Sequence, residues 1–359
     1  MRKFALFVSL FVTSLCFSDR NAERPNLDDP EVRKKIIEDA IEFEILKKAD
    51  GSLQFFEPLE LSPYRGSGWG ALYYINRNVK RLYQLKAGKL EALKTDWYES
   101  GEKKSETNWK NGAQDGLFTF WHENGQKKGQ ENWMDGKLDG LSTFWYENGT
   151  KETEGHFKSG KPIGLQTFWY ENGTKERQVN YKNGKIDGLN TSWYENRQKR
   201  TEGNFKDGKL DGISTFWHKN GQKGFENNYK SGVLHGLSTF WYEDGTKETE
   251  GNYKKGKLDG LSTSWYKNGQ RKVVVLWCES KVVNAKVWLP DGRICPISKI
   301  KDGSGVFVDY DNEGKEVSRK KFKYGFEANE VNEKTKAPLD SSIPLPSLEE
   351  AVFPAIFPK

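Results

Sequence analysis

The sequence predicts an all-β protein in which tandem 24-residue β-hairpin repeats form an elongated antiparallel ribbon or roll, preceded by a short N-terminal helix. Two observations carry this prediction. A tryptophan recurs at an unbroken spacing of 24 residues, and each is followed by two turn signals, a glycine four residues on and a later Lys-x-Gly-Lys string. The repeating tryptophans are Trp97, Trp121, Trp145, Trp169, Trp193, Trp217, Trp241 and Trp265.

The composition favours a thin array over a single large core. Of the 359 residues, 35% are hydrophobic and 30% are charged, whereas aromatic residues reach 14%. Aliphatic side chains are too few to fill one large core, so burial must depend on aromatic rings. Repeat arrays, in which each repeat contacts only its neighbours, suit such a composition.

Each repeat opens with a turn four residues after its tryptophan. An Asn-Gly pair at positions plus three and plus four predicts a type I′ turn, because both central residues of that turn have positive φ. Arg197 replaces the glycine in one repeat. The glycines at this position include Gly125, Gly149, Gly173, Gly221, Gly245 and Gly269. Lys-x-Gly-Lys and a following Asp-Gly predict the second turn, which returns the chain to the next tryptophan strand.

The expected type I′ turn also predicts the pairing of side chains. It places the tryptophan opposite position plus seven and the aromatic residue at plus one opposite the lysine at plus six, so rings recur on both faces about every 9.6 Å, two strand spacings. Packing of the rings on one another is the favoured interpretation, with ligand contact as the alternative. Candidate ligand-facing rings are Tyr146, Tyr170, Tyr194 and Tyr242.

The repeat pattern weakens towards both ends. About eleven repeats fit within residues 69–325. Before them, residues 19–68 contain an amphipathic pattern from Val32 to Leu46, with Asp29 as the cap and Pro30 in the first turn, which predicts a helix that covers the first sheet edge. Residues 326–359 are rich in proline, so we expect a disordered tail or a short docking segment.

The first 18 residues have the three parts of a secretory signal peptide. Arg2 and Lys3 precede an apolar run, and cleavage near Ser18 is expected. The mature protein would then be extracytoplasmic, in the periplasm, on the cell surface or secreted. Cys278 and Cys295 lie on strands separated by a third strand, beyond the Cα distance of about 7 Å that a disulfide spans, so we expect free thiols.

The repeats offer no convergent set of catalytic groups. Histidines replace Tyr, Asn or Asp of sister repeats at three different positions, which favours drift over metal binding; they are His122, His156, His218 and His235. One Asp per Asp-Gly turn is sparse for calcium, which takes six to eight oxygens, so a turn role is favoured. The sequence therefore predicts a non-enzymatic protein without metal or cofactor. Interspersed acids and bases, 51 and 57, disfavour nucleic acid as a partner.

The repeat string, illustrated by Trp145 to Gly149 and by Gly160-Lys161, resembles the variant MORN repeat, in particular that of the bacterial YwqK-type antitoxin family. The resemblance covers about residues 69–325. It implies a hairpin-repeat fold, contact with a protein or the cell envelope, and neutralisation of a partner toxin. Through related eukaryotic repeats it also implies contact with membrane lipid.

The favoured function is an exported scaffold for protein or cell-envelope interaction. Neutralisation of a partner toxin is a further alternative. A signal peptide is difficult to reconcile with an antitoxin that acts against an intracellular toxin. Binding of polysaccharide through the aromatic ladder is the alternative from a different class.

Overall fold

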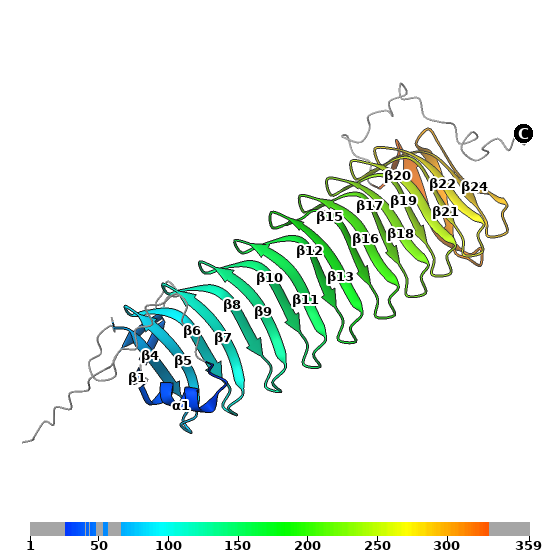
Figure 1. Ribbon diagram of the computed structural model, residues 1–359. Coiled ribbons are helices and arrows are strands. Elements are labelled where there is room, and N and C mark those ends of the chain that lie inside the picture. Colours follow the sequence, from blue (N-terminus) through cyan, green and yellow to red (C-terminus); the bar gives the residue numbers. More distant parts are fainter. Residues whose placement is uncertain (1–25, 40, 43, 48–52, 57–65, 330–359) are drawn as a thin grey trace, which may run out of the picture. The chain divides into compact units, whose positions relative to one another are not determined.

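In the computed structural model, each 24-residue repeat forms one antiparallel hairpin (Figure 1). The structure describes residues 26–39, 41–42, 44–47, 53–56 and 66–329. The expected signal peptide and most of the expected tail lie outside these residues. The chain divides into two compact parts, an N-terminal half (residues 1–162) and a C-terminal half (residues 163–359), and each is described by itself.

The N-terminal half contains one helix and a meander of strands. Its elements are α1 (Pro30–Asp39), β1 (Ile41–Glu42), β2 (Glu44–Lys47), β3 (Leu53–Phe56), β4 (Gly68–Tyr73), β5 (Val79–Lys86), β6 (Lys89–Trp97), β7 (Lys103–Lys110), β8 (Ala113–Trp121), β9 (Lys127–Met134), β10 (Lys137–Trp145) and β11 (Lys151–Lys158). From β4 to β11 each strand pairs antiparallel with the next. Strands β2 and β3 form a separate two-stranded sheet.

The C-terminal half continues the same pattern. After β12 (Lys161–Trp169), which begins at the division, its strands are β13 (Lys175–Lys182), β14 (Lys185–Ile186), β15 (Gly188–Trp193), β16 (Lys199–Lys206), β17 (Lys209–Trp217), β18 (Lys223–Lys230), β19 (Val233–Trp241), β20 (Lys247–Lys254), β21 (Lys257–Trp265), β22 (Arg271–Cys278), β23 (Lys281–Trp288), β24 (Ile294–Lys301), β25 (Ser304–Tyr310), β26 (Glu316–Lys323) and β27 (Phe326–Glu327). The all-β repeat fold predicted from the sequence is confirmed.

The two turns of each repeat differ from their predicted types. At the Asn-Gly turn the loop has three residues, and only Gly149 of Glu147–Gly149 has positive φ. The Gly149 N–H donates to the Tyr146 carbonyl, as in a type I turn followed by a left-handed residue. The asparagine serves through its side chain, because Asn148 Oδ1 accepts the Thr150 N–H at 2.9 Å. The predicted type I′ turn at this position is therefore wrong.

The type I′ geometry occurs instead at the Lys-x-Gly-Lys string. There the loop has two residues, and both have positive φ, as in Ser159 (48°) and Gly160 (79°). The longer first loop also shifts the pair next to the turn by one residue. Trp145 lies opposite Lys151, at position plus six instead of plus seven, and a bulge follows before Phe144 pairs with Thr153.

The hydrophobic core is concentrated at the two ends of the array. Near the start, Leu27, Ala71, Leu82, Leu93 and Trp97 are buried against Ile36 and Ile37 of α1. Near the end, Val273, Val275, Val287, Ile300 and Val308 belong to a second cluster, formed by β22–β25. In the described repeats between these clusters, the buried column is polar: the threonine two residues before the tryptophan, such as Thr143 and Thr239, is less than 9% exposed in every repeat up to Trp241, and Thr263 is half-buried.

The N-terminal segment caps the array in a different way from the one predicted. Asp29 Oδ1 accepts the Glu31 N–H at 2.9 Å, so the predicted cap and helix start are confirmed. The helix ends at Asp39, however, and the predicted continuation to Leu46 is wrong. Ile41 and Glu42 pair in parallel with β4 and satisfy its open edge, while α1 packs on the face of the first strands (Figure 1).

Candidate interaction surfaces

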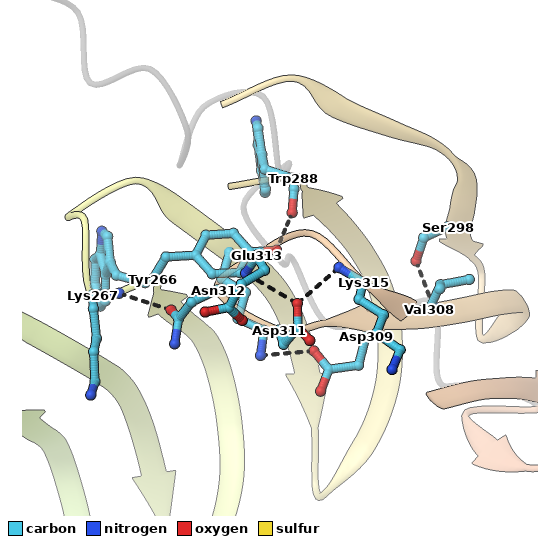
Figure 2. A network of polar contacts seen from close by, with 12 residues as sticks. Tyr266, Lys267, Trp288, Ser298, Val308, Asp309, Asp311, Asn312, Glu313 and Lys315 are labelled. Carbon is cyan, nitrogen blue, oxygen red and sulfur yellow. Dashed lines mark hydrogen bonds and ion pairs between the residues drawn. The ribbon is translucent and has the colours of Figure 1, made fainter. Parts of the chain in front are cut away.

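The tyrosines one residue after the tryptophans join successive hairpins. The Tyr170 hydroxyl donates to the Trp193 carbonyl at 2.8 Å, and the Tyr242 hydroxyl donates to the Trp265 carbonyl at 3.1 Å. Figure 2 shows the same contact from Tyr266 to Trp288, at 2.8 Å. Burial is the main cause that raises the pKa of the Tyr170 and Tyr242 hydroxyls. These contacts stabilise the stacking of the turns.

All four candidate ligand-facing tyrosines are half-buried at this edge of the ribbon. Tyr194 donates to the Trp217 carbonyl at 2.9 Å, and Tyr146 occupies the equivalent place in its repeat. Their rings therefore keep an accessible part while their hydroxyls, where the contact is seen, serve the fold. Two histidines replace tyrosine at this position. His122 Nε2 lies 3.0 Å from the Trp145 carbonyl, whereas the buried His218 Nε2 has no hydrogen-bond partner.

The repeated tryptophans lie in a row with lysines. Lys199 Nζ lies 5.6 Å from the centre of the Trp217 ring in the next repeat, and it also forms an ion pair with Glu202 at 2.6 Å. Lys223 and Lys247 contact the following tryptophans in the same way. Since these cation–π contacts link one repeat to the next, the tryptophan row belongs to the scaffold.

The aspartates of the Asp-Gly pairs cap the next tight turn. Asp211 Oδ2 accepts the N–H of Ser231 at 3.0 Å, and Asp139 Oδ2 accepts that of Ser159 at 3.1 Å. Each of these carboxylates thus accepts the backbone N–H of a turn residue with positive φ. This role in the turn accounts for the recurrence of the aspartate. Among the described residues, no group of three or more His, Cys, Asp or Glu side chains is placed to bind a metal ion.

Both predicted free cysteines are free thiols. Cys295 is buried, with its Sγ 3.3 Å from the Tyr310 hydroxyl, and this hydrogen bond is the main cause that raises the pKa of Tyr310 to about 12. Cys278 is half-buried at the end of β22. In the described part of the chain, no helix is both long and apolar enough to span a bilayer.

A row of exposed aliphatic side chains was missed by the sequence reasoning. The residue four before each tryptophan is exposed in most repeats, by 46% at Leu189, 48% at Ile213 and 41% at Leu237. We call Leu165, Leu189, Ile213 and Leu237 the aliphatic row of the C-terminal half. Its signal was present in the sequence as a Leu or Ile at one fixed position of the repeat.

Two grooves also lie on the sheet, and no residue of the aliphatic row lines either of them. One, in the N-terminal half, has a volume of about 320 Å³ and is lined by bases and rings that include Lys80, Lys104, Lys128, Tyr98 and Phe120. The other, in the C-terminal half, has a volume of about 470 Å³. Its charged lining residues are Glu248, Glu250, Asp309 and Lys272.

The fold and these surfaces define a class, the antiparallel hairpin-repeat proteins, whose members present the same side chains at regular intervals. Within this class, four segments match the family described as MORN repeat variant: residues 114–135, 138–159, 162–183 and 234–255. These matches support the description of the chain as a MORN-repeat protein, and MORN repeats indicate a scaffold for protein or membrane interaction.

A comparison with curated proteins gives no match. Solved structures give matches at low similarity. A point mutant of S. aureus TarM, in complex with fondaparinux, α-GlcNAc-glycerol and UDP, is 10% identical with a TM-score of 0.17; the match covers 44% of this chain and 24% of that chain.

A TcdB2–TccC3–Cdc42 structure is 12% identical (TM-score 0.16), and TcdB2–TccC3 without its hypervariable C-terminal region is 9% identical (TM-score 0.17). Each of these two matches covers 80% of this chain and 18% of the other. The chain thus spans a quarter or less of the length of all three structures.

Proposed function

We propose that the chain is an exported, non-enzymatic scaffold that binds a protein or another component of the cell envelope along the aliphatic row. The recurrence of exposed Leu and Ile at one repeat position is the observation that carries this proposal. A single exposed aliphatic residue needs no explanation, but an apolar row that repeats along a sheet is a feature of interaction surfaces.

The backbone beneath the aliphatic row is held in place. Asn228 Nδ2 donates to the Leu237 carbonyl at 2.7 Å, and Asn180 donates to the Leu189 carbonyl in the same way. These bonds fix the strand under each side chain before a partner binds. Little conformational entropy of the backbone is therefore lost on binding. Equivalent weak contacts along several repeats then add through avidity.

The location outside the cytoplasm is part of the proposal and is supported by the basic residues, apolar run and small residues of positions 1–18. An exported scaffold has access to envelope components. An antitoxin role would instead require the chain to stay where the toxin acts. Sequencing the N-terminus of the protein from fractionated cells separates the two: a start at Asp19 outside the cytoplasm supports export, and an intact Met1 in the cytosol contradicts it.

The binding claim can be tested by co-sedimentation with the envelope fraction of the producing cell. The double variant Leu189→Asp/Ile213→Asp places charge in the aliphatic row. Val233→Asp is the matched control, because Val233 is 46% exposed at the start of β19 and lies outside the row. We expect wild type and control to sediment with the envelope while the double variant, folded as judged by circular dichroism, stays in solution.

Equal sedimentation of the double variant would contradict the role of the row. Treatment of the envelope with protease before mixing identifies the partner class. Loss of binding after this treatment indicates a protein, and retained binding indicates lipid or polysaccharide.

A further inference from the structure

The groove of the N-terminal half is lined by an excess of basic residues, whereas the groove of the C-terminal half is lined by an excess of acidic residues. The lining of the N-terminal groove contains four bases, namely Lys80, Arg81, Lys104 and Lys128, and one acid, Asp96. Asp96 is already paired with Arg81 and with Lys94, the latter at 3.1 Å. The three lysines form no ion pair with any residue that the structure describes, and all three are exposed.

These lysines are spaced by the repeat. Lys80, Lys104 and Lys128 each lie seven residues after a repeat's first aromatic position, so they recur every two strands, about 9.6 Å apart. Two of them lie against rings of the same groove. Lys80 Nζ is 5.3 Å from the centre of the Tyr74 ring, and Lys104 Nζ is 5.1 Å from the centre of the Tyr98 ring.

The groove therefore combines flat rings with ammonium groups at a regular spacing. We propose that it binds an acidic polysaccharide, whose sugar rings stack on the aromatic side chains while its carboxylates pair with Lys80, Lys104 and Lys128. In an extended β-1,4-linked chain, every second sugar presents its carboxylate to the same side, and one such disaccharide is close in length to two strand spacings. Each repeat would then contact one disaccharide.

The spacing separates this ligand from single-stranded nucleic acid. Bases stack on successive aromatic side chains in such complexes, and stacked bases follow one another at about 3.4 Å. The rings beside the lysines, Tyr74 and Tyr98, recur only every second strand and are too far apart to stack on consecutive bases. The proposal does not depend on the aliphatic row, because no residue of the row lines the groove, and the lining residues Phe118 and Phe120 alternate along their strand with Leu117, which holds the row's repeat position.

The groove of the C-terminal half provides an internal comparison. The position seven residues after the tryptophan holds Glu248 in that groove, and its one base, Lys272, is paired with Asp309 at 2.9 Å. A ligand recognised through its negative charge should therefore bind only the N-terminal groove, whereas a ligand recognised through rings alone should bind both.

Isothermal titration calorimetry of the full chain tests the proposal with three probes: β-1,4-oligomannuronate, the neutral β-1,4-mannan oligomer of equal length, and oligothymidylate. We expect the acidic oligomer to bind about tenfold or more tightly than the neutral one, with an affinity that falls as salt is added. The variant Lys80→Gln/Lys104→Gln/Lys128→Gln should lose about tenfold in affinity, since exposed ion pairs contribute modestly one by one.

Arg200→Gln is the matched control. Arg200 lies at the same repeat position in the C-terminal half and contacts the Tyr194 ring at 5.7 Å, but it lies outside both grooves. This variant should bind like wild type. Equal affinity for the neutral oligomer, tighter binding of oligothymidylate, no binding of oligomannuronate, or an equal loss in Arg200→Gln would each overturn the proposal. Lys104→Gln alone repeats the test if the triple variant unfolds.

Discussion

The left-handed residue of the first turn gives a quantitative prediction from two neighbouring repeats. Arg197 has a φ of 70° where Gly173 has a φ of 79°. Both turns are otherwise alike, since the Arg197 N–H donates to the Tyr194 carbonyl at 2.9 Å and the Gly173 N–H donates to the Tyr170 carbonyl at 2.8 Å. A Cβ added to Gly173 would meet no atom within 4 Å. The main difference between the two turns is therefore the cost of this shared backbone conformation, which is higher for a residue with a Cβ.

A residue with a Cβ loses about 1–2 kcal/mol in the left-handed region, whereas glycine loses about 0.4–1 kcal/mol more than other residues through the entropy of the unfolded chain. The net effect predicts that Arg197→Gly raises the free energy of unfolding by about 0.5–1 kcal/mol. Gly173→Arg should lower it by the same amount. The turns lie about two strand spacings apart, so the double variant should return close to wild type.

Urea denaturation followed by tryptophan fluorescence measures these changes, with the slope of the transition checked for each variant. Arg197 also carries a charge, so Arg197→Ala is the control that keeps the Cβ. This control should show no gain. A gain in Arg197→Ala equal to that of Arg197→Gly, or no gain in the latter, would refute the assignment of the strain to the backbone.

Two further predictions concern hydrogen bonds and pH. Tyr194→Phe removes the bond to the Trp217 carbonyl and should cost about 1 kcal/mol, while His218→Tyr supplies the missing hydroxyl of its repeat and should gain about 0.5–1 kcal/mol; thermal unfolding of the two variants measures both, and a loss in His218→Tyr would count against the role of this contact. Burial alone would raise the pKa of Asp96, but Lys94 and Arg81 outweigh it and lower this pKa below 3.8. Because the folded pKa is depressed, the ion pairs stabilise the protein above about pH 4, and this stability is lost as the pH falls through the folded pKa. Asp96→Asn should cost about 3 kcal/mol at pH 7 and flatten the pH dependence below pH 4; an unchanged acid profile would show that Asp96 is not its source.

The sequence was sufficient for the repeat, because a period of 24 residues sets the same strand and turn pattern in every copy. It was insufficient for the turn types. Asn-Gly is compatible both with a two-residue turn and with the observed three-residue loop, and the choice depends on whether Asn148 acts through its φ or through its Oδ1. That choice shifts the pair next to the turn, Trp145 with Lys151, by one residue, and the bulge restores the predicted register from Phe144 onward.

The surfaces were less predictable than the fold, because the repeat pattern does not show which side of the sheet is covered. The aromatic pattern directed attention to tyrosines such as Tyr170, whose hydroxyl contacts a backbone carbonyl of the next repeat. The exposure of Ile213 was not predicted, since an aliphatic strand residue is expected to be buried where one face of a sheet is covered. In the described central repeats both faces keep exposed side chains, so alternation alone does not identify the buried side.

The proposed partner contact is tested most directly by photo-crosslinking in the producing cell. A photoreactive phenylalanine analogue is placed at Ile213 in the aliphatic row and, in a separate variant, at Arg200 as an exposed control. We expect position 213 to give one adduct of defined mass in the envelope fraction and position 200 to give no such adduct. Equal adducts from both positions, or none from position 213, would contradict the claim that the aliphatic row binds an envelope partner.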